Sequence, residues 1–237
     1  YYIENRLPEL NLVGAAYTPF WDAFNTIINS STKLLAVLEG MSDNLFTDGR
    51  KTTMMGEIRF LRGWYMFDLL RMFGEYDKLD SKYGMIIRET PPTSDDVYKA
   101  RSTVQQTYDF ILKDIEYAIS NAPDFTSSDF ASKMAAKALK VKVLFYMGKY
   151  SEALEAANTF IGDGERALVA PYSAVFTDFS NQELIYTRGF AGTDEVKYQA
   201  TRVQAYYNEG KWGPTESFME LVGDDPRKTV ILKNGVG

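Results

Sequence analysis

Residues 56–79 read GEIRFLRGWYMFDLLRMFGEYDKL, and apolar side chains fill most of the positions from Ile58 to Phe73. This pattern predicts a long helix, from about residue 53 to residue 73, with Gly74 at its C-terminal end. A helix this apolar has to be buried, yet three arginines lie along it. The positions of those arginines indicate how the helix packs.

A helical wheel at about 100° per residue separates the charged positions into two groups. One narrow strip holds Glu57, Asp68, Arg71 and Glu75, and the opposite side holds Arg59 and Arg62. The two faces between them are apolar, which predicts that other helices cover this one on both sides, as in a stacked helical array. Arg71 can pair with Asp68 or Glu75 within the helix. Arg59 and Arg62 have no such partner, so they are predicted to reach neighbouring elements or the carbonyls of a helix end.

Two further helices are predicted from apolar periodicity, over residues 17–39 and 102–121. Gly40 follows the first as a C-terminal stop. In the second, Ser102 with Gln105 three residues later has the form of a capping box. Both helices belong to a predicted scaffold that covers about residues 17–161.

Residues 132–161 predict a helical hairpin, with helices over about 132–147 and 151–161. The junction reads YMGKYSEALEAANTFI, and its order of aromatic, Gly, Tyr and Ala residues is typical of a tetratricopeptide-like repeat. Alanines after the turn would let the two helices approach closely. A strict repeat period is absent from the sequence, so a regular array is not expected.

Residues 163–214 are rich in Gly, Pro, Ser and Thr, which predicts a long irregular segment. Within it ELIYTR, residues 183–188, could form a short strand, and residues 214–222 predict a short helix. The fold class is therefore mostly α, with helical hairpins stacked as a scaffold, long loops and little strand. We expect residues 1–237 to form a single domain.

The composition excludes several classes of function. The chain of 237 residues has 26 basic and 32 acidic side chains, for a net charge of −6, which disfavours nucleic-acid binding. It contains no cysteine and no histidine, so disulfides, thiolate catalysis and nucleophiles activated by histidine are absent. No run of apolar residues is long enough to predict a transmembrane helix.

The order of these segments resembles the SusD/RagB family, the surface lipoproteins of Bacteroidetes nutrient-uptake systems. GEIRFLRGWYMFDLLRMFGEY is similar to that family's RFLRA…YF…FG helix, with Gly63 where the family usually has Ala. VQQTYDFILKDIEYAI, SKMAAKALKVKVLFYMGKYSEALEAANTFI, YSAVFTDFSNQELIYT and PTESFMELVGDDPR resemble its later motifs, in the expected order. The family's lipidated cysteine is absent, and members usually continue well beyond the last motif, so we expect a partial or short member.

The resemblance implies a binding protein rather than an enzyme. Members hold a glycan, or in some systems a peptide, at the cell surface and act as a lid over a TonB-dependent SusC-like outer-membrane transporter. The expected location is the outer membrane, through a lipid anchor that this chain does not include. No cofactor, metal or nucleic acid is expected. Asp224 and Asp225 could suggest calcium, but they lack the spaced oxygen ligands of a calcium loop.

Glycan binding needs an aromatic platform against the C–H faces of the sugars, beside side chains that form hydrogen bonds. In the irregular segment, the residues of this kind are Trp212, Tyr206, Tyr207, Tyr198, Arg202 and Asn208. A weaker candidate in the loop before the 53–73 helix consists of Asn44, Asp48 and Arg50. The aromatic residues at helical spacing are predicted to belong to the core: Trp21, Trp64, Tyr65, Phe67 and Phe73.

Two other classes of function, a glycosidase and a helical-repeat adaptor, compete with glycan capture. A glycosidase needs two carboxylates in one cleft, and the acidic residues here lie mostly at solvated helix positions. No phosphate-binding loop, nucleophile elbow or zinc-protease motif is present. A helical-repeat adaptor that binds a protein or peptide is favoured by the 132–161 hairpin and disfavoured by the long irregular segment.

Overall fold

The computed structural model describes five stretches of the chain, residues 10–94, 98–164, 166–178, 180–187 and 213–228. Within these stretches the secondary structure is helical and contains no strand, which confirms the predicted fold class. The chain divides into two compact units, Tyr1–Glu165 and Arg166–Gly237. The boundary falls close to residue 163, where the sequence becomes irregular. The prediction of a single domain stays a prediction.

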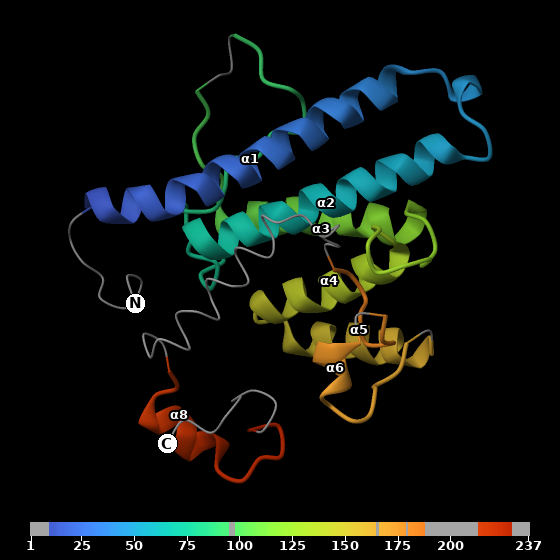
Figure 1. Ribbon diagram of the computed structural model, residues 1–237. Helices are drawn as coiled ribbons and strands as arrows, with labels where there is room; N and C mark the ends of the chain where they lie inside the picture. Colours follow the sequence, from blue (N-terminus) through green and yellow to red (C-terminus); the bar gives the residue numbers. More distant parts are fainter. Residues whose placement is uncertain (1–9, 95–97, 165, 179, 188–212, 229–237) are drawn as a thin grey trace, which may run out of the picture. The chain divides into compact units, whose positions relative to one another are not determined.

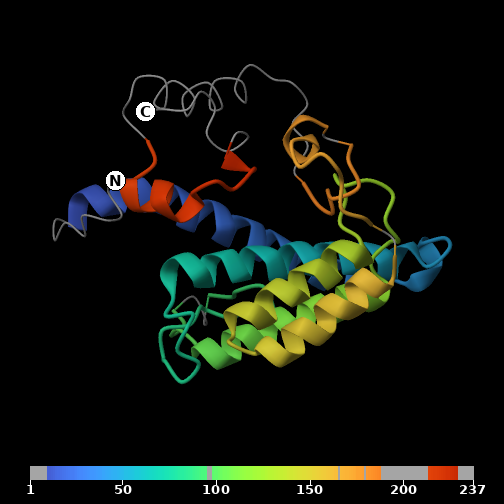
Figure 2. The same cartoon turned by 90° about the horizontal axis from the view of Figure 1, so that it is seen from below.

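The first unit is a stack of five helices in chain order. They are α1 (Leu10–Gly40), α2 (Arg50–Phe73), α3 (Val104–Asn121), α4 (Lys133–Tyr146) and α5 (Tyr150–Gly162), with a 3-10 turn, η1 (Asp43–Leu45), after α1. Each helix packs on the next, and α2 lies between α1 and α3. Figures 1 and 2 show α1 on one side of α2 and the α4–α5 hairpin on the other. The prediction that α2 is covered on both faces is therefore confirmed.

The predicted helix positions are confirmed, and the largest difference at an end is that α1 starts at Leu10 rather than near residue 17. One cap was wrong by one residue. Thr103, not Ser102, caps α3: its side chain accepts from the Gln106 N–H, and the Gln106 side chain accepts from the Thr103 N–H. Ser102 instead exchanges backbone hydrogen bonds with the chain at Gly84 and Met85.

The core of this unit is formed by α2 with the faces of α1, α3 and α4 that pack around it. Its largest fully buried side chains include Phe60, Phe67, Tyr108, Ile111 and Ile115. Fully burying an aliphatic or aromatic side chain of this size contributes about 1.5–3 kcal/mol. The contact between α2 and α3 is close because Gly56 lies directly against the backbone of Ala122. A side chain at position 56 would hold the two helices apart.

The arginines of α2 are part of this buried contact. The Arg62 guanidinium binds Asp114 of α3 through two hydrogen bonds, Nε to Oδ2 at 2.7 Å and Nη2 to Oδ1 at 2.8 Å, and donates to Thr32 of α1 at 3.2 Å. Arg59 adds a third bond to Asp114, at 3.0 Å, and reaches Glu39 of α1 at 3.5 Å. The prediction that both arginines reach neighbouring elements is confirmed. Together they connect α1, α2 and α3.

Arg71 lies at the other charged strip of α2. It pairs with Asp68, as the i,i+3 spacing predicts, and donates to the hydroxyl of Tyr146 in α4 at 3.3 Å. Its guanidinium lies 5.0 Å from the ring centroid of Phe67 and 5.2 Å from that of Tyr146. The hydrogen bonds to Asp68 and Tyr146 raise the Arg71 pKa above its usual value, against the lowering by burial, which is the largest single effect.

Of the predicted core aromatics, Phe67 is fully buried, and the other four are half-buried and pack against neighbouring rings: Trp21, Trp64, Tyr65 and Phe73. Trp21 of α1 meets Phe73 of α2 edge to face, with ring centroids 5.1 Å apart. Trp64 packs in the same way against Phe60, at 5.7 Å, and donates its indole N–H to Asp68 at 2.9 Å. These rings stabilise the helix stack, since such pairs add about 0.5–1.5 kcal/mol to the burial of their area.

In the second unit, the described residues form α6 (Ala174–Thr177) and α8 (Glu216–Val222), with Thr215 as the cap of α8. The predicted strand at 183–188 is wrong over its described part, which begins in a turn and continues without regular secondary structure. Asn181 holds the turn: its side-chain oxygen accepts from the Glu183 N–H at 2.9 Å, and its carbonyl accepts from the Leu184 N–H at 3.2 Å.

After α8, Asp225 and Arg227 form an ion pair in a local turn, with Nη2 to Oδ2 at 2.5 Å. The Arg227 side chain lowers the Asp225 pKa to about 2. The prediction that Arg227 has a structural role agrees with this pairing.

Candidate functional site

The predicted glycan platform lies outside the described residues. All six of its members fall in the stretch 188–212: Tyr198, Arg202, Tyr206, Tyr207, Asn208 and Trp212. Their arrangement around a sugar therefore stays a prediction. Among the described residues, the first unit has concave surfaces on which a site can be built from geometry, and three of them are compared below.

The weaker candidate, Asn44, Asp48 and Arg50, lies in and after η1, in the connection from α1 to α2. The three side chains are exposed, and Asp48 adopts a left-handed backbone conformation, with φ of 51°. Arg50 is directed back onto its own helix, where it pairs with Glu57 at 3.2 Å and donates to Thr53 at 3.4 Å. These contacts agree with the interpretation of the segment as a solvated loop.

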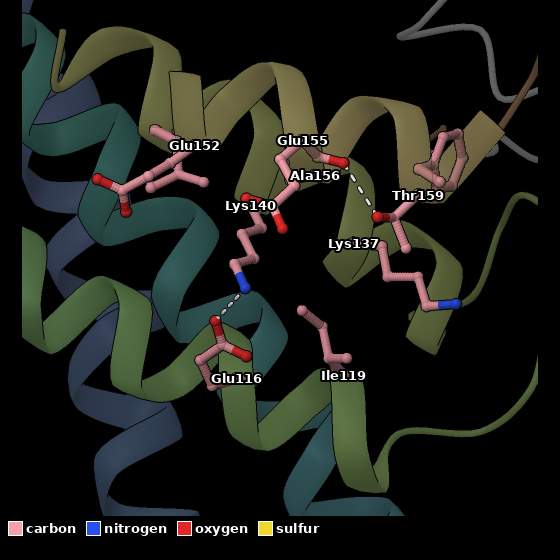
Figure 3. Close-up of a pocket in the computed structure, with 10 residues that line it drawn as sticks. Glu116, Ile119, Lys137, Lys140, Glu152, Glu155, Ala156 and Thr159 are labelled. Carbon is pink, nitrogen blue, oxygen red and sulfur yellow. Dashed lines mark hydrogen bonds and ion pairs between the residues drawn. The ribbon is translucent and has the colours of Figure 1, made fainter. Parts of the chain in front are cut away.

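The first concave surface is a hollow between α3, α4 and α5, with a volume of about 360 Å³ (Figure 3). Its charged rim carries three glutamates and two lysines, and its floor is apolar. The lining consists of Glu116 and Ile119 from α3, Lys137, Lys140 and Leu144 from α4, and Glu152, Glu155, Ala156, Thr159 and Phe160 from α5. A hollow of this size is at the lower end of the range for small-molecule sites.

Ion pairs already connect the walls of this hollow. Lys140 binds Glu116 across the gap between α4 and α3 at 2.6 Å, as Figure 3 shows, and Lys137 binds Asp163 at 2.5 Å. All four side chains are a third to a half exposed, so water and salt screen their charges. This arrangement can bind a polar surface group. It lacks the dry, preorganised environment in which carboxylates act as acid and base catalysts.

The second concave surface is an apolar groove on the opposite side of the α4–α5 hairpin, with a volume of about 510 Å³. Three large side chains line it and are well exposed: Phe145 at 58%, Tyr150 at 64% and Leu154 at 63%. The groove floor consists of Ala138, Val141, Ala153 and Ala157, with Lys142 at the edge. We refer to this set of residues as the outer face. Large exposed apolar patches on soluble domains mark surfaces where another molecule binds.

The outer face did not stand out in the sequence analysis, where the hairpin alanines indicated only close packing between α4 and α5. A signal was nevertheless present. In α5 the residues Tyr150, Leu154 and Ile161 form one stripe, and the buried Ala153 lies beside it. When an apolar stripe is wider than one packed helix can cover, it indicates a second contact on the same helix.

The third concave surface lies between α3 and the segment that precedes it, and has a volume of about 490 Å³. Polar and apolar side chains both line it, and it is open to solvent. Among the described residues, no cluster of three acidic side chains could hold a metal ion on any of these surfaces. No helix of the described residues is long and apolar enough to cross a membrane.

Comparison with known proteins places this helix stack in a family. Residues 5–145 match a SusD-like family model described as "Starch-binding associating with outer membrane". A SusD-like protein of Formosa agariphila is 27% identical over 166 residues, which are 70% of this chain and 30% of the relative.

Solved structures agree on the fold. A SusD superfamily protein from Bacteroides thetaiotaomicron is 30% identical, with a TM-score of 0.57, and the match covers 65% of this chain and 34% of that one. A laminarin-binding SusD-like protein is 22% identical, with a TM-score of 0.58, and the match covers 67% of this chain and 34% of that one. The chain thus spans about a third of the length of these relatives. Because the family model matches more than half of the chain, this protein belongs to the SusD-like family.

Proposed function

We propose that this protein binds a glycan at the cell surface and delivers it to a partner, a TonB-dependent SusC-like transporter of the outer membrane. The observation that carries this proposal is the family match over residues 5–145, whose description joins starch binding to the outer membrane. The same fold occurs in a laminarin-binding protein. In this proposal the protein is a binding protein without catalytic activity, held at the membrane by a lipid anchor.

The two partners would use different parts of the chain. The glycan would stack on the aromatic residues of the 198–213 segment, where Trp212 supplies the largest ring. The transporter would contact the helical repeats, where the outer face offers Phe145, Tyr150 and Leu154. Aromatic and aliphatic side chains that are exposed together supply the desolvated centre that a protein interface needs.

The outer face also favours the second candidate function, a helical-repeat adaptor that binds a protein or peptide. A groove lined almost entirely by apolar atoms suits an amphipathic helix better than a sugar, whose hydroxyls need hydrogen-bond partners. In a RagB-like system, the ligand taken up would itself be a peptide. The two functions differ in which surface is essential.

Affinity gel electrophoresis against a panel of plant, host and microbial polysaccharides tests the proposal, with Trp212→Ala run alongside the unmodified chain. Tyr150→Ala serves as the control, because it removes an exposed aromatic ring from the outer face. We expect one polysaccharide to retard the chain and the control, and to retard Trp212→Ala less. Retardation that survives in Trp212→Ala would keep glycan binding and reject the predicted residues. Absence of retardation by every polymer would favour the peptide-binding candidate.

A further inference from the structure

The helix α1 has two apolar stripes, and only one of them is used in the helix stack. The first stripe packs against α2 and includes Trp21, Ile28, Leu35 and Leu38. The second stripe lies beside it on the helix and consists of Phe20, Ala23, Ile27, Ser30, Leu34 and Val37. We refer to these six residues as the α1 stripe. Ile27 is half-buried and the other five are exposed, with Phe20 at 50%, Leu34 at 47% and Val37 at 58%.

The spacing of the α1 stripe is that of a helix–helix contact. Its successive members are three, four, three, four and three positions apart, which is the pattern of a coiled-coil seam. From Phe20 to Val37 the stripe extends about 26 Å along the helix, at 1.5 Å per residue. A seam of this length and spacing fits a second helix laid along α1.

The charges beside the α1 stripe indicate which helix that is. Residues 18–40 contain three charged side chains, and one of them, Glu39, is bound to Arg59 of the same chain. The other two, Asp22 and Lys33, are exposed, and among the described residues neither forms an ion pair. They are eleven positions apart, which is about three turns, so both lie along the same edge of the stripe. This edge therefore carries one negative and one positive charge, far enough apart not to neutralise each other.

A second copy of α1, running antiparallel, satisfies both charges. Asp22 of each copy then lies beside Lys33 of the other, and the two-fold symmetry forms the pair twice. The same alignment places a larger side chain opposite a smaller one in every layer, which fills the seam evenly. The pairs are Phe20 with Val37, Ala23 with Leu34, and Ile27 with Ser30. A parallel arrangement would bring like charges together and would stack Ala23 and Ser30 on themselves.

We propose that two copies of this chain associate through the α1 stripe, with the two α1 helices antiparallel. This association does not depend on the proposed function. It also leaves the outer face available, because α1 lies on one side of α2 and the α4–α5 hairpin lies on the other (Figure 1).

Sedimentation equilibrium of the full chain at several protein concentrations measures the association. We expect a dimer at the higher concentrations, and we expect Leu34→Glu to raise its dissociation constant about 100-fold, because the seam would bury two unpaired carboxylates. Leu154→Glu is the matched control. It adds the same charge at an exposed leucine of the outer face and should leave the dissociation constant unchanged. Both leucines are exposed, so circular dichroism should show folded chains in both variants.

Charge reversal tests the orientation of the two helices. In the antiparallel dimer, Asp22→Lys alone or Lys33→Asp alone replaces two attractive pairs by two repulsive ones. Each should raise the dissociation constant about 3- to 10-fold at low salt. The double variant restores both pairs and should return the constant to that of the unmodified chain. In a parallel dimer like charges already face each other, so unchanged constants in both single variants would reject the antiparallel arrangement.

Cross-linking gives an independent measure of the orientation, since the chain has no cysteine of its own. In the antiparallel dimer the two copies of Ser30 lie about 5 Å apart along the helix axis, and the two copies of Val37 about 25 Å apart. Oxidation should therefore link two chains of Ser30→Cys and should not link those of Val37→Cys. Equal linking of both variants would contradict the proposal.

Three further results would overturn it. The first is an unmodified chain that stays monomeric at every concentration. The second is a dimer that survives in Leu34→Glu or dissociates in Leu154→Glu. The third is a loss of stability in Leu34→Glu that does not depend on protein concentration, which would mean that another part of the same chain covers the α1 stripe. None of these results changes the retardation of the chain by a polysaccharide, so the proposed function is tested separately.

Discussion

Two pairs of neighbouring helices in the first unit pack in opposite ways. Between α2 and α3, the contact buries charge: Asp114 is fully buried and Arg62 is 3% exposed. Between α4 and α5, the contact is made by small residues such as Ala153, and the large apolar side chains point outward. The α2–α3 contact therefore encloses charged side chains, and the α4–α5 pair exposes apolar side chains to solvent.

This reversal separates two roles. The α2–α3 contact is internally complete, because each charge of the cluster has a partner on a neighbouring helix. Such a contact favours this register of the stack, since a shift of α3 along α2 would separate Asp114 from Arg59 and Arg62. The α4–α5 pair leaves Phe145 and Leu154 exposed to solvent. Their exposure adds little to the stability of the fold, and it provides an apolar surface on which another molecule can bind. Substitutions on the two sides should therefore have very different effects on stability.

The largest effect is expected at Asp114. Replacement by Ala leaves Arg62 buried without a counter-charge, which should lower the free energy of unfolding by about 3–5 kcal/mol. Asp109→Ala is the matched control, because it removes an exposed carboxylate from the same helix and should change stability by about 0.5 kcal/mol or less. Urea unfolding followed by circular dichroism measures both. Similar losses in the two variants would show that the cluster is not a buried determinant of the fold.

The next effect is expected at Gly56, where α2 meets the end of α3. An added Cβ would lie 2.5 Å from the Ala122 nitrogen and 2.7 Å from its Cα, and backbone atoms cannot move aside cheaply. Gly56→Ala should therefore destabilise the fold by about 1–3 kcal/mol.

Gly63 provides the control for Gly56 on the same helix. A Cβ there would have its nearest neighbours at 3.5 Å, an ordinary contact distance. Gly63→Ala should leave stability unchanged or raise it by up to about 1 kcal/mol, because Ala is the better helix former. The family's usual Ala at this position fits that expectation. Thermal unfolding of both variants would contradict the close-contact interpretation if they shifted the midpoint equally.

The buried Tyr108 of α3 allows the packing of this helix to be examined through the pH dependence of stability. Its buried hydroxyl donates to the Tyr76 carbonyl at 3.0 Å, and burial raises its pKa above the usual value near 10. The folded state therefore keeps this proton at a pH where the unfolded state loses it. The stabilisation is complete below pH 10 and declines as the pH rises further, by at most about 1.4 kcal/mol per pH unit.

Tyr108→Phe should lose about 1 kcal/mol at neutral pH, from the missing hydrogen bond, and should show a weaker decline above pH 10. Urea unfolding of both chains at pH 8, 10 and 11 measures the difference. Because the other tyrosines are shared, they cancel in the comparison. Parallel curves for the two chains would mean that Tyr108 titrates normally in the folded state.

The sequence predicted the buried α2–α3 contact better than the exposed face of the α4–α5 pair. The helical wheel separated the charged strips of α2, and from them the sequence correctly predicted that Arg59 and Arg62 contact other elements. The partner, Asp114, could not be named, because it lies 52 residues from Arg62 and only the packing of α3 brings it close. The cap of α3 was misplaced because STVQQ offers two registers. Backbone pairing of Ser102 with Gly84 and Met85 selects the second.

The candidate sites were less predictable, for a physical reason. Helical periodicity reports which residues are apolar, and it does not report whether a second element covers them. Tyr150 and Leu154 lie at helical spacing on α5, the last helix of the first unit, and the spacing alone does not report that both are exposed.

The smallest effect is expected on the outer face, and a matched pair of leucines defines it. Leu70 of α2 is fully buried, so Leu70→Ala should cost about 2–5 kcal/mol through lost burial and the remaining cavity. Leu154 of α5 is 63% exposed, so Leu154→Ala should cost about 0.5 kcal/mol or less. Urea unfolding of the two variants, at several protein concentrations, measures both costs.

A large, concentration-independent cost at Leu154 would mean that another part of the same chain covers the outer face, and would remove it as a docking surface. A cost that grows with protein concentration would mean that two copies pair through it. A small cost at every concentration leaves the face open for a different partner, as the proposed transporter contact requires.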